Sequence, residues 1–205
     1  MIALIDYGAG NLTSVKKALT ALGAEFTVPE TPDDCDGASG LIVPGVGHFS
    51  ATRALDGPWR EAVASNVRAG TPLLGICVGM QWLYEGSEEA SEVPGLGVLE
   101  GTCRLLQGDV AQRLKIPHVG WNALELRCGG ARKSRLLAGL GSSAHVYFTH
   151  SFAAPVTTDC VASATHAECF AAAVERDHVF GVQFHPEKSG EAGLQILRNY
   201  LDLCG

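Results

Sequence analysis

Short apolar runs alternate with segments of helical spacing over about the first 85 residues of the chain. Buried strands are expected at residues 2–5, 25–28, 40–43 and 73–76, and amphipathic helices at residues 12–22 and 59–68. Strands that alternate with helices form a parallel sheet that helices cover on both faces. The predicted fold class is therefore α/β, with an open, mostly parallel twisted sheet flanked by helices.

The pattern changes beyond residue 84. An acidic, glycine-containing loop is expected at residues 84–97, followed by strands at 102–106, 121–126, 145–148, 161–165 and 170–174 and one helical stretch at 134–140. A buried strand at 179–184 precedes a terminal helix that should bury Leu194, Leu197 and Leu201. These segments predict a smaller β region beside the main sheet. No repeat or linker divides the sequence, so one domain is expected over residues 1–205.

The stretch around Cys77 carries the clearest chemical signal. Cys77 lies between Gly75 and Gly79, where an apolar strand meets a segment that becomes helical from Val78. This setting is typical of a nucleophile elbow, with cysteine in place of serine. A Cβ atom two residues to either side would clash in so tight a turn, and the helix N-terminus directs N–H groups at the sulfur, which favours the thiolate. The alternative is a buried structural cysteine in a core strand.

A cysteine nucleophile needs a base and a group that orients the base. His185 follows the expected strand at 179–184, and Glu187 lies two residues further on. The carboxylate can bind one imidazole nitrogen and leave the other free to face Cys77. Active sites of open α/β sheets form where parallel strands end, so these groups could converge. The alternative is a surface histidine in a turn that contains proline.

Backbone N–H groups for an oxyanion could come from two turns. The segment Pro44-Gly45-Val46-Gly47 follows the expected strand at 40–43, and its glycines let the backbone turn N–H groups inward. Val78 in the elbow would supply a second donor. The alternative is an ordinary strand-to-helix loop. Gly8-Ala9-Gly10 resembles a dinucleotide fingerprint only faintly, because Thr13 occupies the third glycine position, and a helix entry capped by Asn11 is favoured.

Composition narrows the possible functions. The 205 residues are 46% hydrophobic and carry a net charge of −7, which argues against a nucleic-acid surface or a polybasic membrane patch. No apolar stretch approaches the ~20 residues that span a bilayer, and Asp6 closes the first apolar run too early for a signal peptide. The 7 cysteines include no C-x-x-C pair. We therefore expect reduced thiols, a cytoplasmic location and no structural zinc.

Several blocks of sequence together point to a family. Gly75-Ile76-Cys77-Val78-Gly79-Met80-Gln81, Pro44-Gly45-Val46-Gly47 and His185-Pro186-Glu187 resemble the class I (triad) glutamine amidotransferases. Within that family, the chain resembles the glutaminase subunits of imidazole glycerol phosphate synthases in the blocks Asp6-Tyr7-Gly8-Ala9-Gly10-Asn11-Leu12, Pro117-His118-Val119-Gly120-Trp121-Asn122 and His185-Pro186-Glu187-Lys188-Ser189. The resemblance runs from Ile2 to the last helix and is loose over residues 101–144. Departures from the family pattern are small. Val78 stands where leucine is common, His48 stands where a small residue is usual, and Gly190 replaces a frequent second serine.

The resemblance implies a flavodoxin-like fold and a reaction, the hydrolysis of L-glutamine by a Cys77–His185–Glu187 triad. The backbone of Gly45, Val46, Gly47 and Val78 would hold the oxyanion. The residues implied for glutamine binding are Gly79, Gln81, Thr149, His150, Ser151 and Phe152. No cofactor or metal is implied.

The resemblance also implies a partner. Ammonia would pass to a cyclase subunit, a TIM barrel that forms a heterodimer with the chain and serves histidine biosynthesis. The residues implied for that interface are Asn11, Pro117, His118, Gly120, Trp121, Asn122 and Lys188. For Trp121, core packing at the start of a strand is the alternative.

Three other functions compete with this interpretation. Another class I glutaminase, such as one that serves pyridoxal phosphate synthesis, is disfavoured by the Pro-His-Val-Gly-Trp-Asn block and by Lys188. A cysteine peptidase or hydrolase on the same type of sheet leaves Gln81 and the His-Pro-Glu turn unexplained. A nucleotide-binding or scaffolding domain would use Cys77 only for core packing, which a thiol-reactivity assay would reveal.

The glycines of the oxyanion segment also predict regulation. Gly45 and Gly47 flank Val46, and glycine adopts positive φ at low cost. The peptide is expected to take two orientations, one that presents an N–H group to the oxyanion and one that presents a carbonyl. The isolated chain should then be a poor glutaminase that its liganded partner switches on. The alternative is a rigid, preformed segment with full activity in the chain alone.

Overall fold

The structure of the protein, a computed structural model, describes residues 1–108, 114–126, 134–141 and 143–205. Within these ranges the main sheet is 8-stranded, in the order β2-β1-β3-β4-β13-β12-β11-β8. The strands from β2 to β13 in this order run parallel, and β12, β11 and β8 extend the sheet as antiparallel strands. Their bounds are β1 Ile2–Leu4, β2 Phe26–Thr27, β3 Gly40–Gly45, β4 Leu73–Cys77, β8 Glu125–Leu126, β11 Cys160–His166, β12 Glu168–Arg176 and β13 Val179–Val182.

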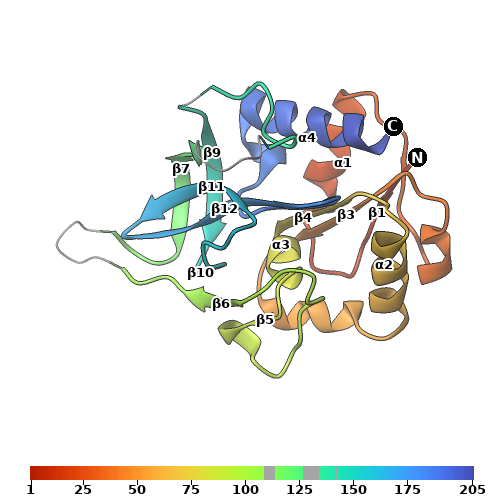
Figure 1. The fold of residues 1–205 in the computed structure, drawn as a ribbon, viewed down its shortest axis with the longest axis horizontal. Coiled ribbons are helices and arrows are strands. Elements are labelled where there is room, and N and C mark those ends of the chain that lie inside the picture. The colour runs from red at the N-terminus through yellow and green to blue at the C-terminus, as the bar shows by residue number, and fades with distance from the viewer. Residues whose placement is uncertain (109–113, 127–133, 142) are drawn as a thin grey trace.

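Helices cover both faces of this sheet (Figure 1). α1 (Leu12–Ala21) and α4 (Gly190–Cys204) lie on one face, and α2 (Pro58–Arg68) and α3 (Val78–Trp82) lie on the other. Short 3-10 helices join the larger elements: η1 Pro32–Cys35, η2 Phe49–Leu55, η3 Glu88–Ala90 and η4 Pro186–Lys188. No helix among the described residues has the length and apolar character that a membrane span requires.

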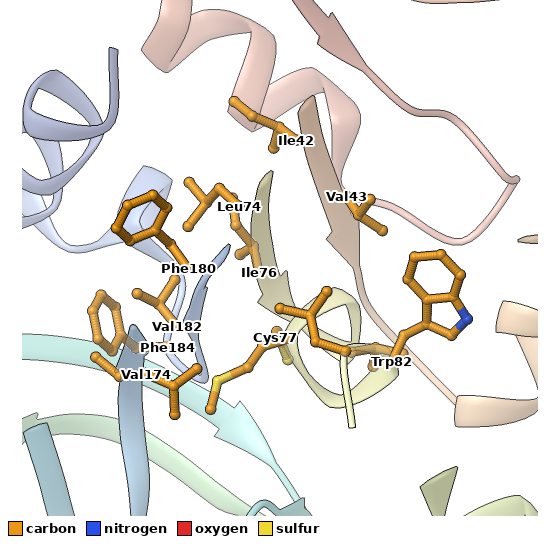
Figure 2. Packing of buried hydrophobic residues seen from close by; sticks show 14 of the residues in the cluster. Ile42, Val43, Leu74, Ile76, Cys77, Trp82, Val174, Phe180, Val182 and Phe184 are labelled. Atoms are coloured by element: carbon orange, nitrogen blue, oxygen red, sulfur yellow. The ribbon is translucent and has the colours of Figure 1, made fainter. Parts of the chain in front are cut away.

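The core lies around the central strands of the sheet. β4 stands between β3 and β13 and is buried along its whole length. A parallel strand packed on both faces needs a continuous apolar run, which explains why Leu73, Leu74 and Ile76 show no polar alternation. Figure 2 shows side chains of β3, β4 and β13 packed around the end of β4, where Cys77 lies. This packing fixes the position of Cys77 in the fold.

A smaller β region stands beside the antiparallel edge of the main sheet. β5 (Gly86–Ser87), β6 (Thr102–Leu105) and β10 (Phe152–Ala153) form one small sheet. β7 (His118–Ala123) pairs with β9 (His145–His150) in an antiparallel ladder. The predicted fold class, a mostly parallel sheet flanked by helices with a smaller β region, is therefore confirmed.

Residues 134–140 form a turn and not the predicted helix. The Ser134 hydroxyl and the Arg135 N–H donate to one carboxylate oxygen of the buried Glu175, at 2.9 and 3.0 Å. Gly139 then takes a φ of 79°, which a right-handed helix does not allow. Because Glu175 anchors the segment, its apolar residues are buried without a helix.

Other boundaries also differ from the sequence expectations. The loop expected at 84–97 contains β5 and η3, and the strand expected at 121–126 is divided between β7 and β8. Asn11 precedes α1, but its side chain makes no capping hydrogen bond. α4 buries Ile196 and Leu197 and leaves Leu194 and Leu201 only half-buried. The reason is the Tyr200 hydroxyl, which donates to two backbone carbonyls at the starts of β3 and β4, at 2.7 and 2.9 Å, and so sets the rotation of the helix.

Candidate active site

Cys77 ends β4 and directly precedes α3, so it lies in a strand-to-helix turn. Its φ is 55° and its ψ is −111°, a backbone conformation that non-glycine residues rarely adopt. A Cβ atom at Gly75 would lie 2.6 Å from the Gly79 carbonyl oxygen, and one at Gly79 would overlap the Val43 carbonyl oxygen. The turn therefore requires both glycines, and it holds Cys77 in a strained conformation.

His185 and Glu187 follow β13, the strand next to β4. Nδ1 of His185 lies 2.8 Å from Oε1 of Glu187, and both side chains are only 1% exposed. The intervening Pro186 begins η4, whose turn brings Glu187 back to the imidazole. The His185 N–H donates to the Tyr147 carbonyl of β9 at 2.9 Å, so the smaller β region also holds this turn in place.

The imidazole of His185 interacts with Cys77 as well as with Glu187. Burial lowers the pKa of His185, but the interactions with Cys77 and then with Glu187 outweigh burial and raise this pKa to about 9. Nε2 of His185 makes no hydrogen bond to a described residue in this conformation, so its interaction with Cys77 is one of proximity and charge. The raised pKa favours the imidazolium form of His185, which suits a thiolate–imidazolium pair.

A pocket lies beside Cys77. Its lining residues are Gly47, Cys77, Val78, Gln81, Glu89, Thr149, His150, Ser151 and Phe152. They include every residue predicted for glutamine binding except Gly79, which packs against the Val43 carbonyl as part of the turn. Sγ of Cys77 lies 3.9 Å from the Thr149 carbonyl oxygen, across from the end of β4. The smaller β region therefore supplies one wall of the pocket and the main sheet supplies the nucleophile.

Glu89 is a pocket residue that the sequence analysis missed. It belongs to η3, inside the stretch that was expected to be a loop. Its Oε2 atom accepts the Phe49 N–H at 2.6 Å, which fixes the carboxylate. In the sequence it is one of several acidic residues between 85 and 92, so no local signal separates it from a solvated loop. Among the described residues, no group of His, Cys, Asp and Glu side chains could hold a metal ion.

The oxyanion segment differs from its predicted arrangement. The Val46 N–H donates to the Ala9 carbonyl at 2.9 Å, so it is bound to the loop after β1 and is unavailable to an oxyanion in this conformation. Gly47 has a φ of 88° and lines the pocket. Gly45 pairs with Cys77 in the ladder between β3 and β4. Val78, at the start of α3, lies beside Cys77 as the elbow requires.

The residues predicted for a partner interface are not all on the surface. Trp121 is 57% exposed and Lys188 is exposed, and both approach the ring of Tyr147, at 6.1 and 6.0 Å from its centroid. His118 is buried and stacks on Phe148 instead, so it cannot contact a partner directly. The remaining predicted residues are Pro117, which precedes β7, Gly120 and Asn122 within β7, and Asn11 before α1.

Comparison with known families agrees with this geometry. A family model described as glutamine amidotransferase class-I matches residues 3–203. The chain belongs to the class I glutamine amidotransferases. Two solved structures share the fold of this amidotransferase. One is titled a glutamine amidotransferase and has a TM-score of 0.75, 23% identity and full coverage of both chains. The other is titled PurLQS from Thermotoga maritima and has a TM-score of 0.72 and 21% identity, with coverage of 98% of this chain and 97% of that one. At these identities the two structures show the fold alone.

Several curated relatives of this amidotransferase are named imidazole glycerol phosphate synthase subunit HisH. The protein of Natronomonas pharaonis is 44% identical over 212 residues, which cover 99% of this chain and 94% of the relative. The protein of Deinococcus radiodurans is 44% identical over 203 residues, with coverage of 97% and 92%. The protein of Gloeobacter violaceus is 45% identical over 206 residues, with coverage of 98% and 88%. The predictions of the family, of a glutamine amidotransferase activity and of the imidazole glycerol phosphate synthase glutaminase are confirmed.

Proposed function

We propose that this amidotransferase hydrolyses L-glutamine with Cys77 as nucleophile, His185 as acid and base, and Glu187 as the carboxylate that orients His185. The proposal is carried by the buried His185–Glu187 pair, 2.8 Å apart, beside a strained Cys77 that lines a pocket. A cysteine with a base that is itself oriented by a third group is the arrangement of a nucleophilic triad. Each group stands on an element that packing or hydrogen bonding holds in place.

The reaction follows from these positions. The Cys77 thiolate attacks the side-chain amide carbon of glutamine, and the C–N bond breaks as His185 gives its proton to the leaving ammonia. The product is a glutamyl thioester on Cys77. His185 then takes a proton from water, whose oxygen attacks the thioester carbon, and the C–S bond breaks to release glutamate. Glu187 keeps its bond to Nδ1, so that Nε2 of His185 exchanges the proton in both steps.

Two side chains of the pocket suit the amino-acid substrate. Oε1 of Gln81 is buried and has no hydrogen-bond partner among the described residues, although Gln81 lines the pocket. A buried acceptor without a partner is costly, so an N–H group of bound glutamine would satisfy it. The Glu89 carboxylate carries the charge that complements an α-ammonium group. The backbone of Thr149, Ser151 and Phe152 completes the wall that faces Cys77.

The ammonia would pass to a cyclase subunit, a TIM barrel that forms a heterodimer with this chain and makes imidazole glycerol phosphate and an aminoimidazole carboxamide ribotide. Val119 and Trp121 of β7 are each 57% exposed, and Lys188 is exposed nearby. An exposed aromatic residue beside a cation is typical of an interface anchor. Thr149 pairs with Val119 and also lines the pocket, so this face adjoins the site of ammonia release. We propose a cytoplasmic location for the complex.

The conformation of the oxyanion segment supports regulation by that partner. With the Val46 N–H bound to Ala9, the hole for the oxyanion lacks one donor, and losing one donor costs on the order of 10²–10³ in rate. Ala9 and Asn11 belong to the same loop, and Asn11 is predicted to meet the partner. A liganded partner that binds this loop better in a second conformation would release Val46 and complete the site.

The experiment that tests the catalytic assignment is covalent labelling. A glutamine-like electrophile, followed by peptide mass mapping, should label Cys77 first among the 7 cysteines and abolish turnover in proportion to labelling. Loss of activity with label on another cysteine would contradict the assignment. Added cyclase subunit should co-purify with the chain, and the complex should make imidazole glycerol phosphate from glutamine.

A further inference from the structure

The side chain of Gln183 reaches the sulfur of Cys77 although Gln183 does not line the pocket. Gln183 is fully buried and follows β13 directly, two residues before His185. The chain bends at Gln183 and Phe184, and the side chains of both Gln183 and His185 reach Cys77. Nε2 of Gln183 lies 3.6 Å from Sγ of Cys77, in hydrogen-bond geometry. Gln183 is not among the residues that line the pocket, so it reaches the sulfur without facing the substrate space.

The orientation of the Gln183 amide is fixed by its neighbours. Nε2 of Gln81 lies 2.9 Å from the Phe152 carbonyl oxygen and 3.1 Å from Oε1 of Gln183. A carbonyl oxygen only accepts hydrogen bonds, so the nitrogen of Gln81 must face Phe152. That same nitrogen then donates to Oε1 of Gln183, which leaves the Gln183 N–H groups to face the sulfur.

His150 holds the same carbonyl from another direction. Its Nδ1 atom lies 2.9 Å from the Phe152 carbonyl oxygen. Burial lowers the pKa of His150 to about 3, so its ring is neutral at pH 7 and carries the proton on Nδ1, where the carbonyl accepts it. Phe152 therefore receives two donors, and the chain of amides that ends at Cys77 has a fixed starting point.

The groups around the sulfur differ in what they offer to a thiol and to a thiolate. The Thr149 carbonyl, 3.9 Å away, can accept a weak bond from S–H but repels the anion once the proton has left. The Gln183 N–H group is a donor, and its bond to sulfur strengthens when the sulfur becomes charged. We propose that Gln183 is a further catalytic residue, whose Nε2–H group holds the Cys77 sulfur and stabilises its thiolate, and that Gln81 and the Phe152 carbonyl position the Gln183 amide. The proposal rests on Cys77 being the nucleophile.

The test follows the rate at which iodoacetamide alkylates Cys77 as a function of pH, with peptide mass mapping, in the full chain. Gln183→Met removes the donor at similar size, and Gln183→Glu keeps the acceptor for Gln81 but places a carboxylate at the sulfur. The midpoint of the alkylation profile should move up by about one pH unit in Gln183→Met and at least as far in Gln183→Glu, because a hydrogen bond to an ionised group is lost. With the partner, kcat should fall about tenfold and KM should change far less.

Tyr200→Phe is the matched control, because it removes a buried hydrogen-bonding group that lies at the opposite end of β4. It should lower the melting temperature and leave the alkylation midpoint unchanged. The wild-type chain gives a test that needs no Gln183 variant: the ¹⁵N-labelled side-chain amide of Gln183 should titrate with Cys77 and lose that titration in Cys77→Ala. An unchanged midpoint in both Gln183 variants, an equal shift in Tyr200→Phe, or an amide signal that does not titrate would each overturn the role of Gln183. Failure of wild-type Cys77 to react first would instead overturn the nucleophile itself.

Discussion

Cys77 and the oxyanion segment stand at the ends of neighbouring strands, β4 and β3, but they are held in different ways. The backbone of Cys77 is enclosed by Gly75, Gly79 and the strand on either side, and no other residue fits at the two glycines. Gly45 is still part of buried β3, but Val46 is half-buried and Gly47 is exposed, and the hydrogen bond from Val46 to Ala9 holds this end of the segment. A Cβ atom at Gly47 would meet nothing within 4 Å.

We propose that this difference separates the catalytic groups from the segment that regulates turnover. The proposed nucleophile, base and orienting carboxylate (Cys77, His185 and Glu187) have buried side chains that lie together in this chain. The proposed oxyanion donor, the Val46 N–H, is bound to the loop after β1, so a partner that bound this loop would change turnover without disturbing the triad.

The largest effects should come from the buried triad. Cys77→Ala and His185→Ala should each lower glutamine turnover by about 10⁴-fold or more, and the double variant should be little worse than either single one, because the residues act in one step. Steady-state glutaminase assays of the complex measure this. Cys169→Ala, an exposed cysteine, is the control and should keep full activity. Losses that multiply in the double variant would mean that the two residues act in separate steps.

Glu187→Gln should cost about 10²-fold in kcat, less than the loss of the base, because His185 stays in place but loses its orienting charge. The matched control is Glu175→Gln, which alters an equally buried carboxylate that anchors a turn and not the site. That control should lower the melting temperature with little change in kcat. If Glu187→Gln also changed only stability, Glu187 would be structural.

The exposed face around Val119, Trp121 and Lys188 should govern the affinity for the cyclase subunit and the coupling of the two activities, and should not affect the triad. Trp121→Ala should weaken binding of the cyclase subunit by about tenfold or more, because exposed aromatic anchors carry much of the binding energy of an interface. Lys188→Ala should weaken this binding or uncouple the glutaminase and cyclase activities. Titration calorimetry and the ratio of glutamine used to product formed measure these effects. Arg68→Ala, at the exposed C-terminal end of α2, is the control. Unchanged affinity and coupling in both variants would remove this face.

The smallest effect should come from the conformation of Gly47. Gly47→Ala places a Cβ in open space at a φ of 88°, so it disfavours the observed conformation by about 1 kcal/mol and should raise turnover of the chain alone by about fivefold. Gly70→Ala is the matched control, because Gly70 has a φ of 95° and equally open surroundings away from the pocket. Equal turnover in Gly47→Ala and the wild type would argue that the segment is rigid.

The sequence predicted the parts of the molecule that short-range rules determine. Gly75 and Gly79 predicted the elbow, because the tight turn at Cys77 leaves no space for a Cβ atom at either position. The turn at 134–140 was misjudged, because its N–H groups bind Glu175, about 40 residues away in the chain. Glu89 was missed for a similar reason: its place in the pocket depends on contact with Phe49 and not on its neighbours.

The hydrogen bond from Val46 to Ala9 also could not be predicted from the sequence. The glycines predicted that two orientations exist, but which orientation is occupied depends on where the loop after β1 lies relative to β3. The burial of His118 was hidden in the same way, because a strand with one exposed face places alternate residues inside, and the motif gave no register.

The most direct test of the separation between triad and oxyanion segment is glutamine turnover by the chain alone, by the chain with the cyclase subunit, and by the complex with cyclase substrate bound. We predict low turnover in the first state and a rise on the order of 10²–10³ in the last, when Val46 leaves Ala9 and the second oxyanion donor is in place. Cys77 should react with a glutamine-like electrophile in all three states. Equal turnover in the three states would contradict the account.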